Sequence, residues 1–513
     1  MLQIQNFHLI QRRDNRVLIE DLSFVVNAGE KVAVIGEEGN GKSTLLRWIF
    51  DPSSVEPYAE AYGQKFTTDV IGYLPQELTP KEAATPVCDW LETACALSTL
   101  PYASAAKAAK ALSLDAALLW ETRSLSNLSG GERIKVQLAA LLLRDCDLLL
   151  LDEPSNDLDL NAVRWLESFL QRTDKTVLYV SHDELLLERT ADAVIHLELV
   201  RRKTIPRATF ARKPYRQYIE ERERQLSHQA QIAAFEQDAF LEKKERYLSI
   251  YNAVNHAQNT VSRRDPGTGR LLKKKMHTVQ SIGRRLEKER ESLTEAPEAE
   301  WAILPKVEEG VFIPNGRTVL DLSLDTLKVG ERVLAENVRL CVRGPERVCI
   351  IGRNGCGKST LLKRIAAELL GRKDLVVGYM PQSYDDALDP TETPVSFLAP
   401  NGDKDSVTRA RLYLGSMKYT TDEMEHPVRA LSGGQRAKLL LLKLILDRCN
   451  VWILDEPTRN FSPLSAPAVR ALLRSFPGTV IAVSHDRKLL REVATACYRL
   501  TETGLFAVDR DEI

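Results

Sequence analysis

Short apolar runs that end at a glycine, an aspartate or a histidine recur along this chain. KVAVIG (31–36), LLLLD (148–152) and TVLYVSH (176–182) have the length of buried strands, and helical patterns alternate with them. Strands that are apolar on both faces and alternate with helices are typical of a parallel sheet covered by helices. Residues 1–197 are therefore predicted to form an α/β domain.

Residues 301–513 repeat this arrangement, because RVCIIG, VWILD and TVIAVSH follow one another there in the same order. Asp152 and Asp455 lie 303 positions apart, and so do His182 and His485. A nearly constant offset across a whole domain indicates an internal duplication. A second α/β domain is therefore expected in this part of the chain.

The segment between the two domains, residues 198–300, follows a different pattern. Residues 214–248 are rich in Glu, Arg, Gln and Leu and contain no glycine, which predicts a long helix. A breaker at 265–269, DPGTG, separates it from a second predicted helix at 271–292. The apolar face of this second helix consists of Leu272, Met276, Val279 and Leu286. Two helices joined by a loop predict an antiparallel hairpin.

The charge of the chain is unevenly distributed. The net charge is −1, but residues 201–290 contain 22 Lys or Arg and only 10 Asp or Glu. A solvated spacer would also fit this composition, but the basic bias and the projecting tip favour contact with a polyanion.

The composition predicts a soluble protein of a reducing compartment, and we expect a cytoplasmic one. The eight cysteines are scattered without a CxxC pair, which argues against a disulfide or zinc framework. Charged residues interrupt the most apolar stretch far short of the ~20 residues that a membrane helix needs. The first ten residues lack the features of a signal peptide.

Two glycine-rich loops carry the strongest chemical signal. GEEGNGKS (36–43) and GRNGCGKS (352–359) each follow a predicted strand and open a helix. Backbone N–H groups of such a loop and the N-terminus of its helix bind phosphates, the lysine contacts the β- and γ-phosphates, and the serine hydroxyl binds Mg²⁺. The predicted ATP-binding residues are Gly36, Gly39, Gly41, Lys42, Ser43, Thr44, Gly352, Gly355, Gly357, Lys358, Ser359 and Thr360.

Polar residues at the ends of the other strands predict hydrolysis of the bound nucleotide. An aspartate that closes a buried strand suits Mg²⁺, and the glutamate after it can polarise the attacking water. Alone, each glutamate could be a surface acid and each histidine a structural one, but the repeat favours catalytic roles. The predicted metal ligands are Ser43, Gln76, Asp152, Ser359, Gln382 and Asp455. The predicted catalytic residues are Glu153, Glu456, His182, His485, Gln76 and Gln382.

The runs LSGGE and LSGGQ, which contain Ser129, Gly130, Gly131, Ser432, Gly433 and Gly434, complete a set that resembles the ATP-binding cassette architecture. The resemblance implies two P-loop ATP-binding cassette domains in tandem that pack head to tail. Each ATP then lies between the phosphate loop of one domain and the serine–glycine loop of the other. Site one would pair Lys42 with Ser432, and site two would pair Lys358 with Ser129.

Two cassettes joined by a basic helical linker, without a membrane span, resemble the ABC-F family of ribosome-associated ATPases. The resemblance implies binding to the 50S exit-site region and to peptidyl-tRNA by a protein that is monomeric, either as a translation factor or in antibiotic resistance. The residues implied to contact nucleic acid are Arg263, Arg264, Arg270, Lys273, Lys274 and Lys275. The alternative is the ATP-binding subunit of a transporter whose membrane protein is a separate chain, but such a subunit needs no basic hairpin. DNA-repair ATPases with zinc modules or very long coiled coils fit less well.

The sequence departs from the family pattern in three places. No room exists for an arm between Gln76 and Ser129, and the usual aromatic residue for adenine stacking is missing. The loop after the second glutamate has Ser462 where the first half has Asp159. Because this loop reaches the opposite phosphate loop in cassette proteins, site one is expected to be the altered one and hydrolysis at the two sites to be unequal.

Overall fold

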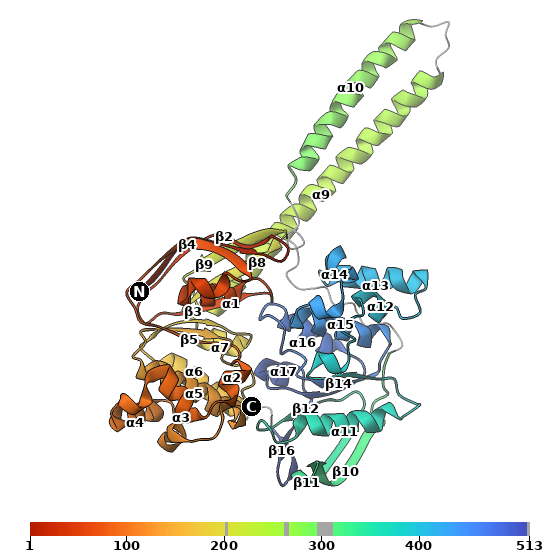
Figure 1. The fold of residues 1–513 in the computed structure, drawn as a ribbon. Coiled ribbons are helices and arrows are strands. Elements are labelled where there is room, and N and C mark those ends of the chain that lie inside the picture. Colours follow the sequence, from red (N-terminus) through yellow and green to blue (C-terminus); the bar gives the residue numbers. More distant parts are fainter. Residues whose placement is uncertain (201–203, 261–265, 295–310, 510–513) are drawn as a thin grey trace. The chain divides into compact units, whose positions relative to one another are not determined.

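A computed structural model describes residues 1–200, 204–260, 266–294 and 311–509 of the chain. The chain forms two compact units (Figure 1). The larger unit combines Met1–Tyr215 with Glu300–Ile513 and contains both α/β domains, here called the first half and the second half. The smaller unit, Arg216–Ala299, contains the helical hairpin.

The first half is built on a six-stranded sheet in the order β5-β6-β7-β3-β8-β9. All neighbouring strands are parallel except β8 and β9, which are antiparallel. The strands are β3 (Lys31–Gly36), β5 (Ile71–Leu74), β6 (Leu148–Asp152), β7 (Thr176–Val180), β8 (Ala193–Leu199) and β9 (Ile205–Ala211). A smaller antiparallel sheet has the order β2-β1-β4 and consists of β1 (Leu2–Gln11), β2 (Arg16–Val26) and β4 (Ala59–Thr67). The helices are α1 (Lys42–Phe50), α2 (Pro80–Ala84), α3 (Val87–Cys95), α4 (Tyr102–Ala111), α5 (Gly130–Leu143), α6 (Leu160–Arg172) and α7 (Glu184–Thr190).

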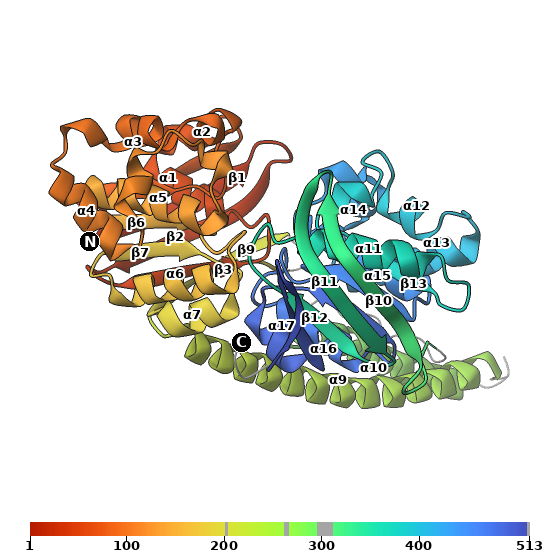
Figure 2. The same cartoon turned by 90° about the horizontal axis from the view of Figure 1, so that it is seen from below.

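The second half repeats this sheet in the order β13-β14-β15-β12-β16-β17. Its antiparallel pair β10–β11 forms a long two-stranded ribbon (Figure 2). The strands are β10 (Thr318–Val329), β11 (Arg332–Arg343), β12 (Arg347–Ile351), β13 (Val377–Met380), β14 (Val451–Asp455), β15 (Thr479–Val483), β16 (Ala496–Thr501) and β17 (Gly504–Val508). The helices are α11 (Lys358–Leu370), α12 (Pro394–Leu398), α13 (Lys404–Ser416), α14 (Thr421–Glu425), α15 (Gly433–Leu446), α16 (Ala466–Ser475) and α17 (Arg487–Glu492). The tandem α/β fold expected from the duplication is confirmed.

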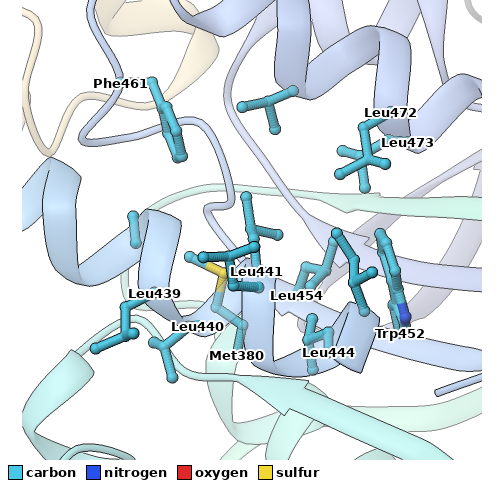
Figure 3. Packing of buried hydrophobic residues seen from close by; sticks show 14 of the residues in the cluster. Met380, Leu439, Leu440, Leu441, Leu444, Trp452, Leu454, Phe461, Leu472 and Leu473 are labelled. Atoms are coloured by element: carbon cyan, nitrogen blue, oxygen red, sulfur yellow. The ribbon is translucent and has the colours of Figure 1, made fainter. Parts of the chain in front are cut away.

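The central strands are buried because helices cover both faces of each sheet. Every residue of β6, β7, β14 and β15 is buried, which explains their continuous apolar sequences. In the second half, Trp452 of β14 stacks on Phe476 with ring centroids 3.9 Å apart. Trp452 packs within the cluster that includes Met380 and Leu454 (Figure 3). This core fixes the strand ends that carry the polar residues.

Strand β9 lies within residues that the sequence analysis assigned to the linker. It pairs with β8 from Val194↔Ala211 to Leu199↔Pro206, so it belongs to the sheet of the first half. The smaller unit accordingly begins at Arg216 rather than at residue 198. The edge position of β9 explains the difference, because a half-exposed strand has no long apolar run.

The hairpin consists of α9 (Tyr215–Thr260) and α10 (Pro266–Glu291). Two expectations for it were wrong. The first helix continues past residue 248 to Thr260, and the residues Pro266 to Gly269 form the first turn of α10 instead of a breaker. Proline is favoured in the first turn of a helix, where its missing N–H is not needed. Asp265 lies outside the described residues.

The two hairpin helices run antiparallel, and contacts between them involve Lys243 and Tyr247 of α9 (Figure 1). Met276 and Val279 of α10 are buried, as the apolar pattern predicted. Gly283 lies against Tyr247 of α9, where a Cβ would come within 2.6 Å of the tyrosine hydroxyl. Lys243 pairs with Glu289 near the C-terminal end of α10. Within the described residues, no helix combines the length and apolar character needed to span a bilayer.

Candidate functional site

The glycine-rich loop of the first half connects β3 to α1. Gly36 has a φ of 147° and lies so close to β8 that a Cβ would collide with the carbonyl oxygen of Leu197. Gly41 caps α1 with a φ of 88°, a left-handed conformation that favours glycine. Lys42 is buried, and its Nζ donates hydrogen bonds to the carbonyls of Gly36 and Glu37, both at 2.9 Å. The loop therefore curls around its own lysine.

The loop of the second half has the same construction. Gly357 caps α11 with a φ of 99°, and Lys358 Nζ donates to the carbonyls of Gly352 at 3.0 Å and Arg353 at 2.9 Å. Burial lowers the pKa of Lys358, as it does for Lys42. Gly39 and Gly355 occupy left-handed positions in their loops. The hydroxyl residues Ser43, Thr44, Ser359 and Thr360 are half-buried in the first helical turns.

The strand-terminal aspartates lie beside these loops. Asp152 ends β6, and its two carboxylate oxygens accept hydrogen bonds from Ser43 Oγ at 2.8 Å and from the Tyr73 hydroxyl at 3.2 Å. Asp455 ends β14, and both of its oxygens are buried without a hydrogen-bond partner among the described residues. Burial raises the pKa of both carboxyl groups. Unpartnered buried oxygens next to a serine hydroxyl fit a hydrated divalent cation.

The described side chains alone do not form a complete metal cage. No group of three or more His, Cys, Asp or Glu side chains in the described part of the chain could hold a metal ion. Magnesium commonly takes only one or two protein ligands and completes its shell with water and phosphate oxygens. The arrangement of Ser43 with Asp152, and its counterpart in the second half, fits such a shared site.

The glutamates that follow the aspartates have an unusual backbone. Glu153 has a φ of 51° and Glu456 a φ of 52°, in the left-handed region that non-glycine residues rarely occupy. Their N–H groups donate to the carbonyls of Val180 at 3.1 Å and Val483 at 2.9 Å, on the neighbouring strands. Such strain persists where the surrounding structure imposes it, and it concentrates at functional sites.

The side chain of Glu153 is held by two neighbours. His182 Nε2 lies 2.7 Å from its Oε1, and Asn156 Nδ2 donates to its Oε2 at 2.8 Å. Burial alone would raise the pKa of Glu153, but the contacts with His182 and the charge of Lys42 outweigh burial and lower it to about 2. Glu153 is therefore an ionised carboxylate in a fixed orientation.

The corresponding pair in the second half is looser. His485 Nε2 lies 3.7 Å from Glu456 Oε1, and the His485 backbone N–H donates to Oε2 at 3.2 Å. Burial raises the pKa of Glu456 to about 8. Burial and the charge of Lys358 lower the pKa of His485 to about 4. The pKa values of the two equivalent glutamates are thus shifted in opposite directions.

Gln76 and Gln382 follow the edge strands β5 and β13 and are exposed. The parallel pairs Leu74↔Leu151 and Met380↔Leu454 bring each glutamine to the strand ends that carry the aspartates. The structure therefore places both glutamines at the expected edge of the sheet, on loops.

The serine–glycine loops open the longest helices of the two halves. Ser129 caps α5 in a reciprocal pair with Glu132, and Ser432 caps α15 in the same way with Gln435. These helix N-termini present backbone N–H groups outward, as an anion site requires. Gly130 is packed so closely that a Cβ would collide with the carbonyl oxygen of Asp157.

Each serine–glycine loop faces the phosphate loop of the other half. Glu38, in the first phosphate loop, accepts hydrogen bonds from the backbone N–H groups of Gly433, at 3.2 Å, and Gly434. In the second phosphate loop, Asn354 Nδ2 donates to the carbonyl oxygen of Asp157, beside Gly130. The head-to-tail arrangement implied by the family resemblance is thus present in the larger unit.

Sequence reasoning did not find Glu38 as a functional residue. The signal was available, because Glu38 and Asn354 hold the same position in the two phosphate loops, 316 residues apart like Lys42 and Lys358. A carboxylate in a loop built for phosphate is a chemical anomaly. In this structure that carboxylate accepts hydrogen bonds from the backbone N–H groups at the start of α15.

The basic residues assigned to nucleic acid lie near the start of α10. Arg270, Lys273, Lys274 and Lys275 are exposed, and none forms an ion pair with another described residue. Arg263 and Arg264 lie outside the described residues.

Comparisons with known proteins agree with this geometry. A family model described as "ABC transporter" matches residues 19–156 and 335–459, which together cover half of the chain. The probable ATP-binding protein YheS of Escherichia coli K12 is 28% identical over 98% of this chain and 79% of its own length. The ribosome protection protein VmlR of Bacillus subtilis is 28% identical, covering 96% and 85%. The energy-dependent translational throttle protein EttA of Haemophilus influenzae is 29% identical, covering 94% and 88%.

Proposed function

Because the chain belongs to the ATP-binding cassette family, and within it to the ABC-F branch of twin-cassette ATPases, we propose that it acts on the ribosome. ATP closes the two halves, the closed form engages the exit-site region of the 50S subunit, and the α9–α10 hairpin contacts peptidyl-tRNA. The role is that of a translation factor or of a protein that protects the ribosome from antibiotics. With these partners, the protein works as a monomer in the cytoplasm.

The observation that carries this proposal is the basic surface of the hairpin. Residues 216–290 have 16 basic and 10 acidic residues, whereas the net charge of the whole chain is −1. Four exposed basic residues without ion pairs lie near the start of α10: Arg270, Lys273, Lys274 and Lys275. Lysine and arginine in such a cluster bind nucleic-acid phosphates without reading sequence. The similarity to VmlR, a ribosome protection protein, and to EttA, a translational throttle protein, supports the same partner.

Nucleotide binding by the two sites follows from the loops and the helix ends. We propose that Lys42 and Lys358 release their loop carbonyls and contact the β- and γ-phosphates. The N–H groups at the start of α15 and of α5, including those of Gly434 and Gly131, bind the γ-phosphate from the opposite half. Bound Mg²⁺ would neutralise phosphate charge, held by Ser43, Gln76 and Asp152 in one site and by Ser359, Gln382 and Asp455 in the other.

Hydrolysis is assigned to the strained glutamates. In their ionised forms, Glu153 and Glu456 orient the attacking water and accept its proton, while His182 and His485 position the carboxylate and the γ-phosphate. The fixed backbone of each glutamate, with its N–H bonded to the neighbouring strand, keeps the carboxylate in place without reorganisation. When the phosphate leaves, the contact that holds the halves together is lost, and the clamp opens.

A ribosome sedimentation experiment tests the proposal. The double variant Glu153→Gln, Glu456→Gln should bind ATP without hydrolysing it and should cosediment with 70S ribosomes in the presence of ATP. The same variant without nucleotide, or with Lys42→Ala and Lys358→Ala added, is the control and should remain in the supernatant. A double variant that binds ATP but never cosediments with ribosomes would show the proposal to be wrong.

The contribution of the hairpin is measured in the same assay. Lys273→Gln together with Lys274→Gln should weaken binding and reduce the slope of log affinity against log salt by roughly 1 to 2. Lys107→Gln together with Lys110→Gln removes the same charge from the exposed face of α4 and serves as the matched control. Equal effects of the two pairs would argue against a specific role of the hairpin.

A further inference from the structure

Four buried charged residues connect the first half to the second half away from the phosphate loops. Helices α6 and α7 contribute Glu167 and Glu184, and helices α16 and α17 contribute Arg470 and Arg487. All four are at most 8% exposed. The helices α7 and α17 contact each other (Figure 2).

These residues form two ion pairs between the halves. Arg470 makes a bidentate contact with Glu184, with Nη1 to Oε1 at 2.6 Å and Nη2 to Oε2 at 3.2 Å. Arg487 Nη1 donates to Glu167 Oε2 at 2.7 Å. Lys488 Nζ adds a bond of 2.7 Å to Glu184. In the bonds that cross between the halves, every cation comes from the second half and every anion from the first half. Within their own halves, Arg470 Nε also donates to Glu492 at 3.0 Å and Arg189 donates to Glu167 at 2.7 Å.

The two ion pairs are copies of each other under the internal duplication. Glu167 and Arg470 are equivalent positions 303 residues apart, and so are Glu184 and Arg487. A pair of identical domains that closed in this way would carry one acid and one base on each domain. Here both positions are acidic in the first half and both are basic in the second half. The duplicated positions keep the same contact geometry, but at these positions the first half carries only negative charge and the second half only positive charge.

The position of Arg487 supports a role between the halves. It is the first residue of α17, and Lys488 follows it, so both cations lie at the positive end of a helix dipole. The equivalent residue Glu184 at the start of α7 has the sign that this position favours. The helix dipole therefore does not favour an arginine at position 487. The ion pair with Glu167 of the first half does favour it.

We propose that this separation of charge determines which domains can pair. Two first halves meeting in this geometry would bring Glu167 to Glu184 twice, and the arginines that bond these carboxylates from the second half, Arg487 and Arg470, would be absent. Glu167 would keep only its bond from Arg189 of its own half. Two second halves would bring Arg470 to Arg487. Breaking or mismatching a buried ion pair is strongly unfavourable, whereas its net gain over apolar residues is small, so its main effect is specificity. Only a first half and a second half can close, and within one chain their effective concentration is high.

The test uses two full-length variants that cannot close on themselves. The acidic variant contains Arg470→Glu and Arg487→Glu, and the basic variant contains Glu167→Arg and Glu184→Arg. Each alone should be monomeric in analytical ultracentrifugation and should lose ATPase activity by at least about tenfold. An equimolar mixture should form a 1:1 heterodimer through oppositely charged faces and recover activity. Neither readout depends on ribosome binding, so this result is independent of the proposed function.

Three outcomes would overturn the inference: either variant alone keeps the activity of the wild type, either variant forms homodimers, or a mixture of folded variants remains monomeric and inactive. A milder pair covers the case in which the double substitutions prevent folding. Arg470→Glu alone should lose activity by at least about tenfold, and adding Glu184→Arg should restore it to within about threefold. Failure of this second substitution to restore activity would equally overturn the inference.

Discussion

The two halves of this protein have the same strand order and the same polar residues at the strand ends, but the two candidate sites between them differ. Site one combines the first phosphate loop with Ser432. It contains Glu38, whose carboxylate accepts hydrogen bonds from the N–H groups of Gly433 and Gly434. Site two combines the second phosphate loop with Ser129 and has the neutral Asn354 at the position of Glu38. A duplication thus preserves the backbone that binds phosphate more strictly than the side chains around it.

The loops that cross between the halves add to this difference. Asp159 lies close enough to Lys358 and His485 for its charge to raise the pKa of both groups, although other effects dominate their pKa values. Its counterpart Ser462 is buried and bonded to Ser465 within its own half. Site two therefore receives the carboxylate of Asp159 from the opposite half, whereas the equivalent Ser462 supplies none to site one. Site one, by contrast, has the tighter glutamate–histidine pair.

The largest expected effect is a difference in phosphate release between the single variants Glu153→Gln and Glu456→Gln. It shows whether the loop with Asp159 and Glu38, or the glutamate–histidine contact, decides the rate. If the crossing loop and Glu38 decide the rate, site two performs most of the hydrolysis. Glu456→Gln should then lower steady-state phosphate release by at least about tenfold, and Glu153→Gln by no more than about twofold. If the 2.7 Å contact between Glu153 and His182 decides the rate, the two losses should be reversed. Equal losses would contradict any functional asymmetry between the sites, and ATP binding by both variants is the control.

Glu38 provides the next largest effect. Glu38→Asn gives the first loop the residue of the second loop, removes a negative charge from the phosphate site and frees the N–H groups of α15. In a Lys358→Ala background, it should tighten ATP binding at site one by about threefold to tenfold, measured by titration with a fluorescent ATP analogue. Asn354→Glu in a Lys42→Ala background should weaken site two by a similar factor.

The matched control for this experiment is Glu37→Gln, in the same loop. It removes the same charge, but Glu37 is not bonded to the N–H groups of α15, so its effect on affinity should be clearly smaller. If Glu37→Gln changes ATP affinity as much as Glu38→Asn does, net charge alone explains the change. The hydrogen bonds of Glu38 would then not contribute to the difference between the two sites.

The sequence predicted the parts of the molecule that repeat. Strands β6 and β14 could be predicted because every residue in them is buried, which gives a continuous apolar sequence. The loops around Lys42 and Lys358 could be predicted because their left-handed backbone favours glycine at fixed positions. Residues whose importance depends on contact between the halves were missed. Nothing local distinguishes Glu184 or Arg470 from surface charges, and only the folded contact shows that they form a buried pair.

The hairpin shows a second limit of sequence reasoning. A proline followed by two glycines was taken as a breaker at 265–269, but Pro266 begins α10 and Gly269 lies within its first turns. Local propensity does not distinguish a loop from the first turn of a helix, since proline suits both. Strand β9 was missed for a related reason, because its pairing with β8 rather than its own pattern makes it a strand.

The smallest expected effect concerns Asp159 and is the most selective test of the crossing loop. Asp159 Oδ1 accepts a hydrogen bond from the Ala162 N–H at 2.9 Å and so caps α6. Serine caps a helix about as well, so Asp159→Ser should leave the melting temperature unchanged while removing the charge near Lys358. In a Glu153→Gln background, it should lower phosphate release from site two by about threefold. Asp159→Ala removes both cap and charge, so a rate loss that appears only with alanine, together with a lower melting temperature, would assign Asp159 a structural role alone.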